Sequence, residues 1–431
     1  MELEQRRIGF SGNLHSPRYD RSREEPRIQR GQRDGVRFSQ VHHAGIRHLF
    51  ARARARTDAA DERALARTLE TLTHATERAG LNFEVVRQSV FTSDPRVAAC
   101  FESERLFKHG SGPVIDLFWQ QPADGSLLVI ESWGVASGEE SVNVEHPVAN
   151  LALVRQESMT TVHAACVARR ISGSGVHAQT LAGFEALRSL LAVGGVGFDR
   201  VVRTWLYLGE ITGGDGATQR YKELNRARSD FFATCSLAPN RSLTADSQYA
   251  YPASTGIGAL GHDLALGCLA LVTDREDVQA IPLENPRQVA AHDYGAIYSP
   301  QSPKFSRAMA VEIGTDALIL ISGTASITRS ETRHLGDAVA QTEETLTNIE
   351  ALIAEANLAR HGLPGFGCTL ADLGVARVYI KREADYPAVR EVCERRLGQV
   401  PVTYTVADVC RCQLLVEIEG IAFSRWTLAS P

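Results

Sequence analysis

The sequence predicts an α+β protein built from three related units in a pseudo-threefold arrangement. A helix, a short connection and a β-rich strand with Val-Arg or Ala-Arg near its start occur three times, with the strands at 83–91, 198–207 and 370–380. A closing apolar strand follows each copy, at 127–131, 264–269 and 414–419. The length of 431 residues also exceeds one usual hydrophobic core. Three such units predict clefts between neighbours, where ligands commonly bind.

The N-terminal segment is expected to be irregular. Residues 1–37 include a stretch rich in Arg, Pro, Gly and Ser with few apolar residues, which predicts a leader without regular structure. The three arginines between 52 and 56 are expected to begin a helix that ends at Ala79 and Gly80, because leucines recur at helical spacing after them. Acidic residues nearby favour a solvated, ion-paired helix face over a patch that binds nucleic acid.

Glycine, proline and polar residues near 141–148 and 282–303 indicate the boundaries between units. They predict an N-terminal unit at 38–148, a central unit at 149–285 and a C-terminal unit at 286–431. The distance from the repeated arginine to the closing strand is longest in the second copy, which predicts an insertion within 236–258. Because the chain itself supplies three units, it is expected to be a monomer.

The composition is that of a soluble globular protein, with 44% hydrophobic and 23% charged residues. A net charge of −5 gives no reason to expect nucleic acid or an anionic membrane as a partner. No run approaches the ~18 apolar residues of a membrane span, and residues 1–12 lack the apolar core of a signal peptide. The eight cysteines include no CxxC pair. They are expected to be reduced thiols in a cytoplasmic protein, and no metal site is predicted.

Two carboxylates share one face of the last closing strand. Side chains alternate along a strand, so Glu417 and Glu419 point to the same side of an apolar segment that ends at Gly420. Burial and a like-charged neighbour both raise the pKa of a carboxyl group, which would leave one of the two protonated at neutral pH, as a general acid requires. Alternatively, the two are ordinary surface glutamates on the solvated face of an edge strand.

Several segments of the C-terminal third resemble the Rid/YjgF fold, a mixed β-sheet with helices packed on one face. They are ISGTAS at 321–326, GD at 336–337, Gln341, ETL at 344–346, NI at 348–349 and the strand at 414–419. Proteins of that family form homotrimers with ligand sites between subunits. The resemblance therefore implies three Rid-like units within this one chain.

The middle third is more specifically similar to the chorismatases, enzymes that fuse three Rid-like units. The similar segments are RTWLY at 203–207, Tyr221, AR at 227–228, TGIG at 255–258, ENP at 284–286, YSP at 298–300 and SPKFSRA at 302–308. The similarity runs from about 150 to 423. The first 80 residues depart from it, because the N-terminal unit of chorismatases is shorter.

The resemblance implies a site between the central and C-terminal units, with Glu417 as the proton donor to chorismate. Chorismate carries an enol ether and two carboxylates, and hydrolytic cleavage begins when a proton reaches its terminal methylene carbon. Arginine suits the carboxylates because its guanidinium is planar and bidentate. Arg411 resembles the carboxylate-binding arginine of Rid proteins, and Arg228 lies in the similar Ala-Arg motif. From the residues alone, a surface salt bridge for Arg228 and a solubilising strand end for Arg411 stay open.

Four further positions are expected to contact the substrate. Tyr207 and Tyr379 lie on the repeated strand and offer hydroxyl groups, although each is equally consistent with a core aromatic. Thr255 and Gly256 begin the TGIG segment, where backbone amides approach a carboxylate closely because glycine has no side chain.

Two positions bear on the product. Gly323 and Cys410 resemble the chorismatase branch that makes 3-hydroxybenzoate, whereas the branch that makes the non-aromatic dihydroxy acid carries alanine at both. The expected reaction is therefore chorismate to 3-hydroxybenzoate and pyruvate, catalysed by Glu417 and Cys410 without cofactor or metal. Hydrolysis to a dihydroxycyclohexadiene carboxylate, a Rid-type imine deaminase and a non-catalytic ligand-binding scaffold stay open as alternatives.

Overall fold

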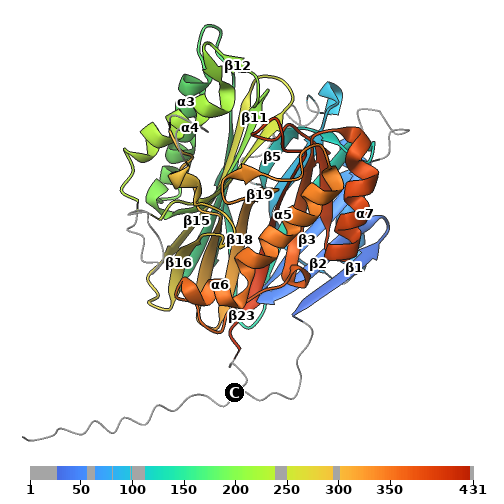
Figure 1. Cartoon of the computed structure of the whole chain (residues 1–431). Helices are drawn as coiled ribbons and strands as arrows, with labels where there is room; N and C mark the ends of the chain where they lie inside the picture. The colour runs from blue at the N-terminus through green and yellow to red at the C-terminus, as the bar shows by residue number, and fades with distance from the viewer. Residues whose placement is uncertain are drawn as a thin grey trace, which may run out of the picture.

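The computed structural model describes residues 27–55, 64–79, 81–97, 99, 112–237, 250–294 and 301–427. In this part the chain forms three large sheets that share one strand order (Figure 1). Counted along the chain within each unit, without the two-residue strands, the strands lie in the order first, second, third, sixth, fourth, fifth. The two-residue strand Gln121–Pro122 adds a seventh strand at the edge of the C-terminal sheet. The fourth and fifth strands run parallel and the other neighbours are antiparallel. The strands and helices confirm the predicted α+β class, and the shared strand order is the pattern expected of three related units.

The elements of each unit are as follows. The N-terminal unit contains β1 (Ile28–Arg33), β2 (Val36–His43), β3 (Ile46–Ala55), α1 (Ala64–Arg78), β4 (Glu84–Thr92), β5 (Val114–Trp119), β6 (Gln121–Pro122) and β7 (Leu128–Ser137). The central unit contains β8 (Asn143–Val148), β9 (Leu151–Gln156), β10 (Met159–Ala168), α3 (Val176–Val193), β11 (Val201–Gly209), β12 (Gly214–Asp215), β13 (Thr218–Gln219), α4 (Arg220–Phe232), β14 (Ala253–Ala259) and β15 (Leu264–Thr273). The C-terminal unit contains β16 (Val278–Leu283), β17 (Ala308–Ile313), β18 (Asp316–Ala325), β19 (Ile327–Thr328), β20 (Glu331–Thr332), α5 (Ala338–Ile353), α6 (Glu355–Arg360), β21 (Leu373–Ile380), α7 (Tyr386–Leu397), β22 (Val402–Val406) and β23 (Val416–Arg425).

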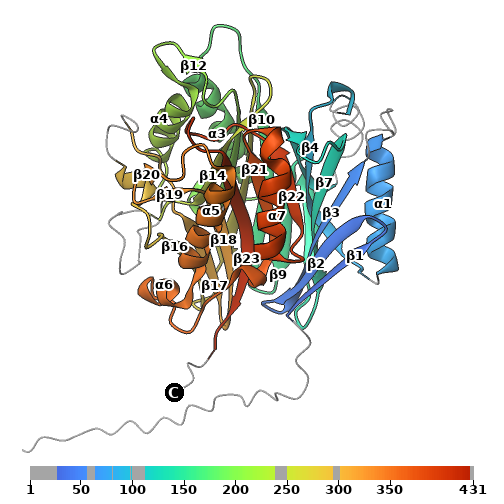
Figure 2. The same ribbon diagram turned by 45° about the vertical axis from the view of Figure 1, so that its right-hand side comes forward.

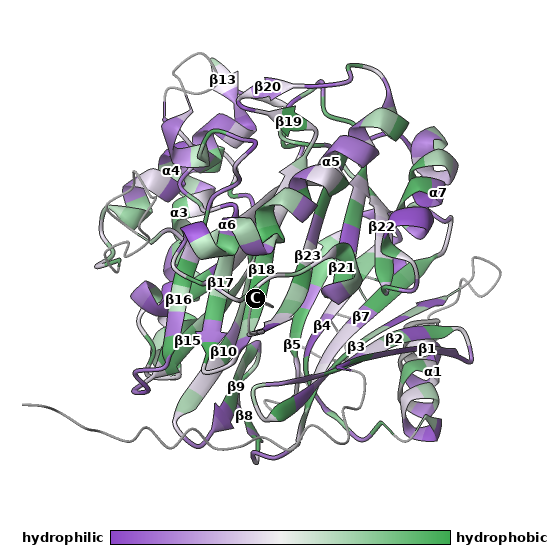
Figure 3. Ribbon diagram, turned by 60° about the horizontal axis from the view of Figure 1, so that its bottom comes forward, coloured by the Kyte–Doolittle hydropathy of each residue, from purple (hydrophilic) through white to green (hydrophobic). Residues whose placement is uncertain are grey.

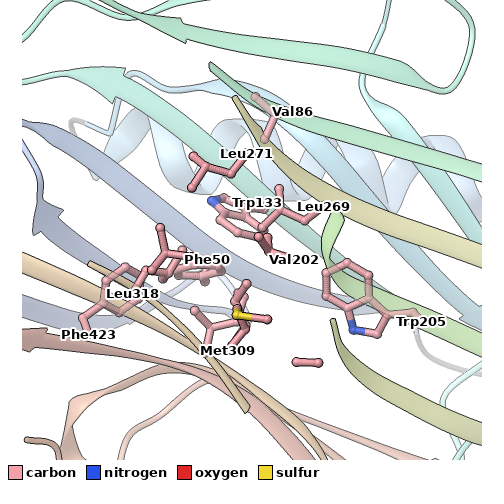
Figure 4. Close-up of a cluster of buried hydrophobic side chains, with 14 of the residues drawn as sticks. Phe50, Val86, Trp133, Val202, Trp205, Leu269, Leu271, Met309, Leu318 and Phe423 are labelled. Atoms are coloured by element: carbon pink, nitrogen blue, oxygen red, sulfur yellow. The ribbon is translucent and has the colours of Figure 1, made fainter. Parts of the chain in front are cut away.

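The helices lie outside and the sheets face one another inside. Figure 2 shows α1 on the outer side of the N-terminal sheet, α3 and α4 beside the central sheet, and α5 and α7 over the C-terminal sheet. Hydrophobic residues follow the strands, while hydrophilic residues gather on helix faces and turns (Figure 3). The inner faces of all three sheets contribute to one buried cluster (Figure 4), which includes Phe50, Trp133, Trp205, Met309 and Phe423. Burial of this shared apolar surface stabilises the association of the units.

Two expectations for the N-terminal unit are wrong. The irregular leader expected at 1–37 does not extend to residue 37, because β1 and β2 form a hairpin that begins at Ile28. The rest of that expectation, residues 1–26, lies outside the described residues. The expected start of the helix near Arg52 is also wrong. Residues 46–55 form β3, and α1 begins at Ala64. The buried alanines of β3 alternate with arginines in the period of two that suits a strand. Arg52 and Arg54 form ion pairs with Asp124.

The unit boundaries, judged by sheet membership, also lie earlier than expected. β8 pairs with β9 and β16 pairs with β17, so each of these strands belongs to the unit that follows it. β14 occupies the sheet position held by β5 and β22 in the other units. The insertion expected within 236–258 therefore ends before β14, and the extra length of the central unit lies between α4 and β14.

Candidate active site

A cavity of about 770 Å³ lies between the central and C-terminal units. Its walls come from α4 and β14 on one side, and from β18, β23 and the connection between β22 and β23 on the other, in the region between α4 and β19 in Figure 1. Hydrogen bonds fix the two sides together. Ser254 N donates to Ser322 Oγ at 2.8 Å, and Ser322 Oγ donates to the Ser306 carbonyl at 2.6 Å. The predicted residues that line the cavity are Arg228, Gly256, Gly323, Cys410, Arg411 and Glu417.

Glu417 lies at the base of this cavity on β23. β23 is an interior strand between β18 and β21, so the alternative of a solvated edge strand is wrong. Both glutamates of the strand are buried, with Glu417 4% and Glu419 3% exposed. A β-bulge in β18 places Ser322 and Gly323 opposite Glu419 of β23. A Cβ at position 323 would lie 2.1 Å from Glu417 Oε1, so this conformation of the acid requires glycine there.

The surroundings of Glu417 favour its neutral form. Burial, and to a smaller extent the nearby Glu419, raise the pKa of Glu417 to about 8, against the opposing effect of Arg203 and Arg307. A carboxyl group with such a pKa is mostly protonated at pH 7. It can therefore donate a proton to a group bound in the cavity.

Three arginines border the cavity. Arg228, from α4, donates from Nη2 to Asn225 Oδ1 at 2.6 Å, and its guanidinium lies 5.4 Å from the Phe305 ring centre. Arg307, which precedes β17, donates to the Val289 carbonyl at 2.9 Å. Arg411 donates to the Ser330 carbonyl at 2.8 Å. In the described part of the chain, neither Arg228 nor Arg307 has a carboxylate oxygen within 4.0 Å. Among the described residues, Lys222 is a fourth cationic side chain in the lining, whereas the lining has two acidic side chains, Glu331 and Glu417. The excess of cations suits an anionic ligand.

The connection that carries Cys410 and Arg411 is held against β14. Gly258 N donates to the Asp408 carbonyl at 2.8 Å, and a Cβ on Gly258 would lie 2.7 Å from that oxygen. The Asp408 carboxylate accepts a hydrogen bond from Thr212 at 2.6 Å and pairs with Lys381 at 2.9 Å. Burial, and to a smaller extent Glu417, raise the pKa of the Cys410 thiol to about 12, so the thiol is neutral.

Three predicted contacts lie elsewhere. Tyr207 and Tyr379 are fully buried where the sheets meet, their hydroxyl oxygens are 2.6 Å apart, and Tyr379 donates to Glu419 at 2.9 Å. Tyr207 also stacks on Phe118 of the N-terminal unit. Thr255 is buried beneath the lining and accepts a hydrogen bond from Gly323 N at 2.9 Å. None of these three lines the cavity within the described chain, so the expectation that they contact a ligand is corrected.

Sequence reasoning assigned no role to several residues that line the cavity. These are Arg307, Tyr221, Lys222, Asn225, Tyr294 and Phe305. A signal existed for three of them, because Tyr221, Phe305 and Arg307 lie in segments that resemble chorismatases. Nothing local to the sequence marks Tyr294, since its position at the cavity depends on how the connection before β17 crosses the central unit.

The described ranges contain neither a metal-binding cluster nor a helix that could span a membrane. No cluster of three or more His, Cys, Asp or Glu side chains there could hold a metal ion. Among the helices of the same residues, none is long and apolar enough to cross a membrane.

Comparison with known proteins points to one family. A chorismatase FkbO/Hyg5-like N-terminal family model matches residues 140–270. The chain is 36% identical over 231 residues to a 3-hydroxybenzoate synthase of Streptomyces hygroscopicus, a match that covers 52% of this chain and 64% of the relative, just under two thirds of its length. It is 34% identical over 259 residues to a chorismatase of Streptomyces rapamycinicus, covering 59% of this chain and 73% of the relative.

The fold has a counterpart among solved structures. A chorismatase crystal structure matches with a TM-score of 0.61 and 23% identity, covering 89% of this chain and 99% of that chain. At this level of identity the likeness shows a shared fold.

Proposed function

We propose that this chain, which belongs to the chorismatase family, cleaves chorismate to 3-hydroxybenzoate and pyruvate with Glu417 as the general acid. The observation that carries the proposal is a buried carboxyl group, in surroundings that raise its pKa, at the base of a cavity bordered by three arginines. The relative named 3-hydroxybenzoate synthase supports the choice of product. No cofactor enters the proposed reaction.

The arginines would bind the two carboxylates of chorismate. Arg228 and Arg411 were expected in this role, and Arg307 joins them because it borders the same cavity. Guanidinium groups bind carboxylates through paired, charge-assisted hydrogen bonds. Gly256 lets the substrate approach the backbone of β14, since a side chain there would project toward the Tyr221 ring. The bound substrate would then present its enol ether to Glu417.

Glu417 would deliver its proton to the terminal methylene carbon of the enol ether. The carbon–hydrogen bond forms as the carbon–carbon double bond breaks, and positive charge develops on the adjacent ether carbon and oxygen. Water adds to that carbon, and the resulting hemiketal releases pyruvate and leaves a hydroxyl group on the ring. Loss of the neighbouring ring hydroxyl as water, with a ring proton, gives 3-hydroxybenzoate. One water is consumed and one is released, so the atoms balance.

Gly323 and Cys410 are proposed to favour the aromatic product. Gly323 leaves the space that Glu417 occupies, and Cys410 places a neutral thiol on the same cavity. The polarisable sulfur would lie beside the ring while the ring hydroxyl leaves. Without this assistance, the reaction would stop at the dihydroxy acid.

The test is to incubate the purified protein with chorismate and identify the products by chromatography. We expect pyruvate and 3-hydroxybenzoate in equal amounts. The variant Glu417→Gln should keep its fold and its affinity for a chorismate analogue but lose about 10²- to 10⁴-fold in turnover, because an amide cannot deliver the proton. Absence of chorismate cleavage by the wild-type protein, or near-native turnover by the variant, would refute the proposal. Assays with imino acids in parallel would reveal a deaminase.

A further inference from the structure

A buried ion cluster lies where the three sheets meet. It consists of Arg203, Arg377, Glu131 and Glu419, which we call the axial cluster. Arg377 pairs with Glu131 at 2.7 Å and with Glu419 at 3.2 Å, and Arg203 pairs with Glu419. Each of the three units contributes at least one member, and Arg203 and Arg377 occupy the same position of the repeated strand. With two charges of each sign, the cluster is neutral, which limits the cost of its burial.

Within the axial cluster, Glu419 is held as a carboxylate. It accepts hydrogen bonds from Arg203 and Thr255 at one oxygen, and from Arg377 and Tyr379 at the other. A carboxylate only accepts hydrogen bonds, so four donors around it match its ionised form. Because these donors come from two units and are themselves buried, the negative charge has a fixed position.

Glu417 has the opposite environment. It lies two residues away on the same face of β23, about 7 Å along the strand. No cation of the described chain lies within 4.0 Å of its carboxyl oxygens. The ionisable groups near it are Glu419 on its own strand, Arg203 from β11, Arg307 before β17, Tyr221 from α4 and Cys410. The two acids are thus close together but have very different partners: four donors surround Glu419, and no cation in the described ranges pairs with Glu417.

We propose that Glu419 is a positioning residue that keeps Glu417 protonated, and therefore able to act as an acid, at neutral pH. The inference rests on the proposed function. The fixed negative charge opposes a second negative charge on Glu417. Glu419 also anchors the bulge beside the acid, because Thr255 donates to Glu419 and accepts from Gly323 N at 2.9 Å. The same residue thus stabilises the backbone that leaves room for the acid.

The test compares Glu419→Gln with wild type in the pH dependence of kcat/KM for chorismate. The substitution removes the negative charge and leaves Arg203 uncompensated, and both effects lower the pKa of Glu417. Because the protonated form is active, the alkaline decline in activity should move to lower pH. Unit charges ~7 Å apart at an effective dielectric constant of ~20 correspond to a shift of about one to two pH units. Glu419→Asp, which retains the charge, should largely restore the wild-type profile.

Glu131→Gln is the matched control. It makes the same chemical change in the same cluster, but Glu131 bonds to Arg377 and is not among the groups near Glu417. In Glu131→Gln, kcat/KM should decline at the same alkaline pH as in wild type. An unmoved decline in Glu419→Gln, or an equal shift in both variants, would overturn the inference while leaving chorismate cleavage intact.

A second variant and a spectroscopic measurement test the inference if Glu419→Gln does not fold or if the protein does not cleave chorismate. If Glu419→Gln does not fold, Arg377→Gln combined with Glu419→Gln removes one charge of each sign. A shift in the same direction is required of it, because Glu419 is among the groups near Glu417 and Arg377 is not. If the wild-type protein does not cleave chorismate, the proposed function fails, and infrared titration decides the inference. The protonated-carboxyl band that Glu417→Gln lacks must persist to higher pH in wild type than in Glu419→Gln. Loss of the band at the same pH in both would refute the inference.

Discussion

Gly323→Ala tests the position of Glu417 directly, because the added methyl group would contact the Glu417 carboxyl group. The new carbon would lie 2.1 Å from Glu417 Oε1 and 3.0 Å from Glu417 Cδ, whereas ordinary contacts begin at 3.4 Å. The carboxyl oxygen must therefore retreat by about 1.3 Å. Misplacement of a catalytic group by ~1 Å can cost about 10²-fold in rate. We expect kcat for chorismate cleavage to fall by about that factor.

The fold should tolerate this substitution. The group that must move is the end of a flexible side chain, and β18 has no positive φ angle at this position, so Tm should change little. Gly256→Ala is the matched control, since it adds the same methyl group to the same cavity but meets Tyr221 Cε2 at 3.1 Å. It should alter KM more than kcat. A wild-type kcat in Gly323→Ala, measured by pyruvate release at saturating chorismate, would refute the placement of Glu417 as the acid.

Three further predictions concern pH, binding and product. Glu417 acts in its protonated form, and its pKa is raised to about 8. The value of kcat/KM should therefore be constant near neutrality and fall about tenfold per pH unit above 8. A decline in kcat/KM that is already complete by pH 6 would contradict this. Arg228→Ala and Arg411→Ala should each raise KM roughly 10- to 100-fold, because each removes a charge-assisted hydrogen bond to a substrate carboxylate. Calorimetry with a chorismate analogue measures the same loss of affinity. Unchanged affinity in both variants would place the ligand elsewhere. Gly323→Ala combined with Cys410→Ala should shift product from 3-hydroxybenzoate towards the dihydroxy acid, with pyruvate still released at the lower rate expected for Gly323→Ala. An unchanged product ratio by chromatography would mean that the two residues do not select the product.

Sequence patterns predicted the parts of this molecule that depend on local periodicity. The repeated Val-Arg strand and the closing strand became β4, β11 and β21 with β7, β15 and β23, because strand periodicity and burial specify these elements locally. The shared face of Glu417 and Glu419 followed from alternation alone. The helix predicted from the leucine spacing is α1, but it begins later than the expected start near Arg52, because the alternating alanines and arginines before it form β3.

The arrangement between units was harder to predict. Tyr207 and Tyr379 carry hydroxyl groups on the repeated strand, yet they meet each other and Glu419 rather than the cavity. Arg377 lies 246 positions from Glu131 in sequence, so no local pattern indicates their pairing. The role of Arg307 likewise depends on contacts across the interface. Residues of this kind are identified only when the units are packed together.

Cleavage of chorismate in D₂O tests the central claim, that Glu417 protonates the terminal methylene carbon of the enol ether. Because the acidic proton of Glu417 exchanges with solvent, each pyruvate released by the wild-type protein should carry one deuterium in its methyl group, detected by mass spectrometry within minutes of mixing. Glu417→Gln should release such pyruvate at least about 10²-fold more slowly. Pyruvate that forms at the normal rate without deuterium would show that the hydrogen comes from the substrate itself, and would contradict acid catalysis by Glu417.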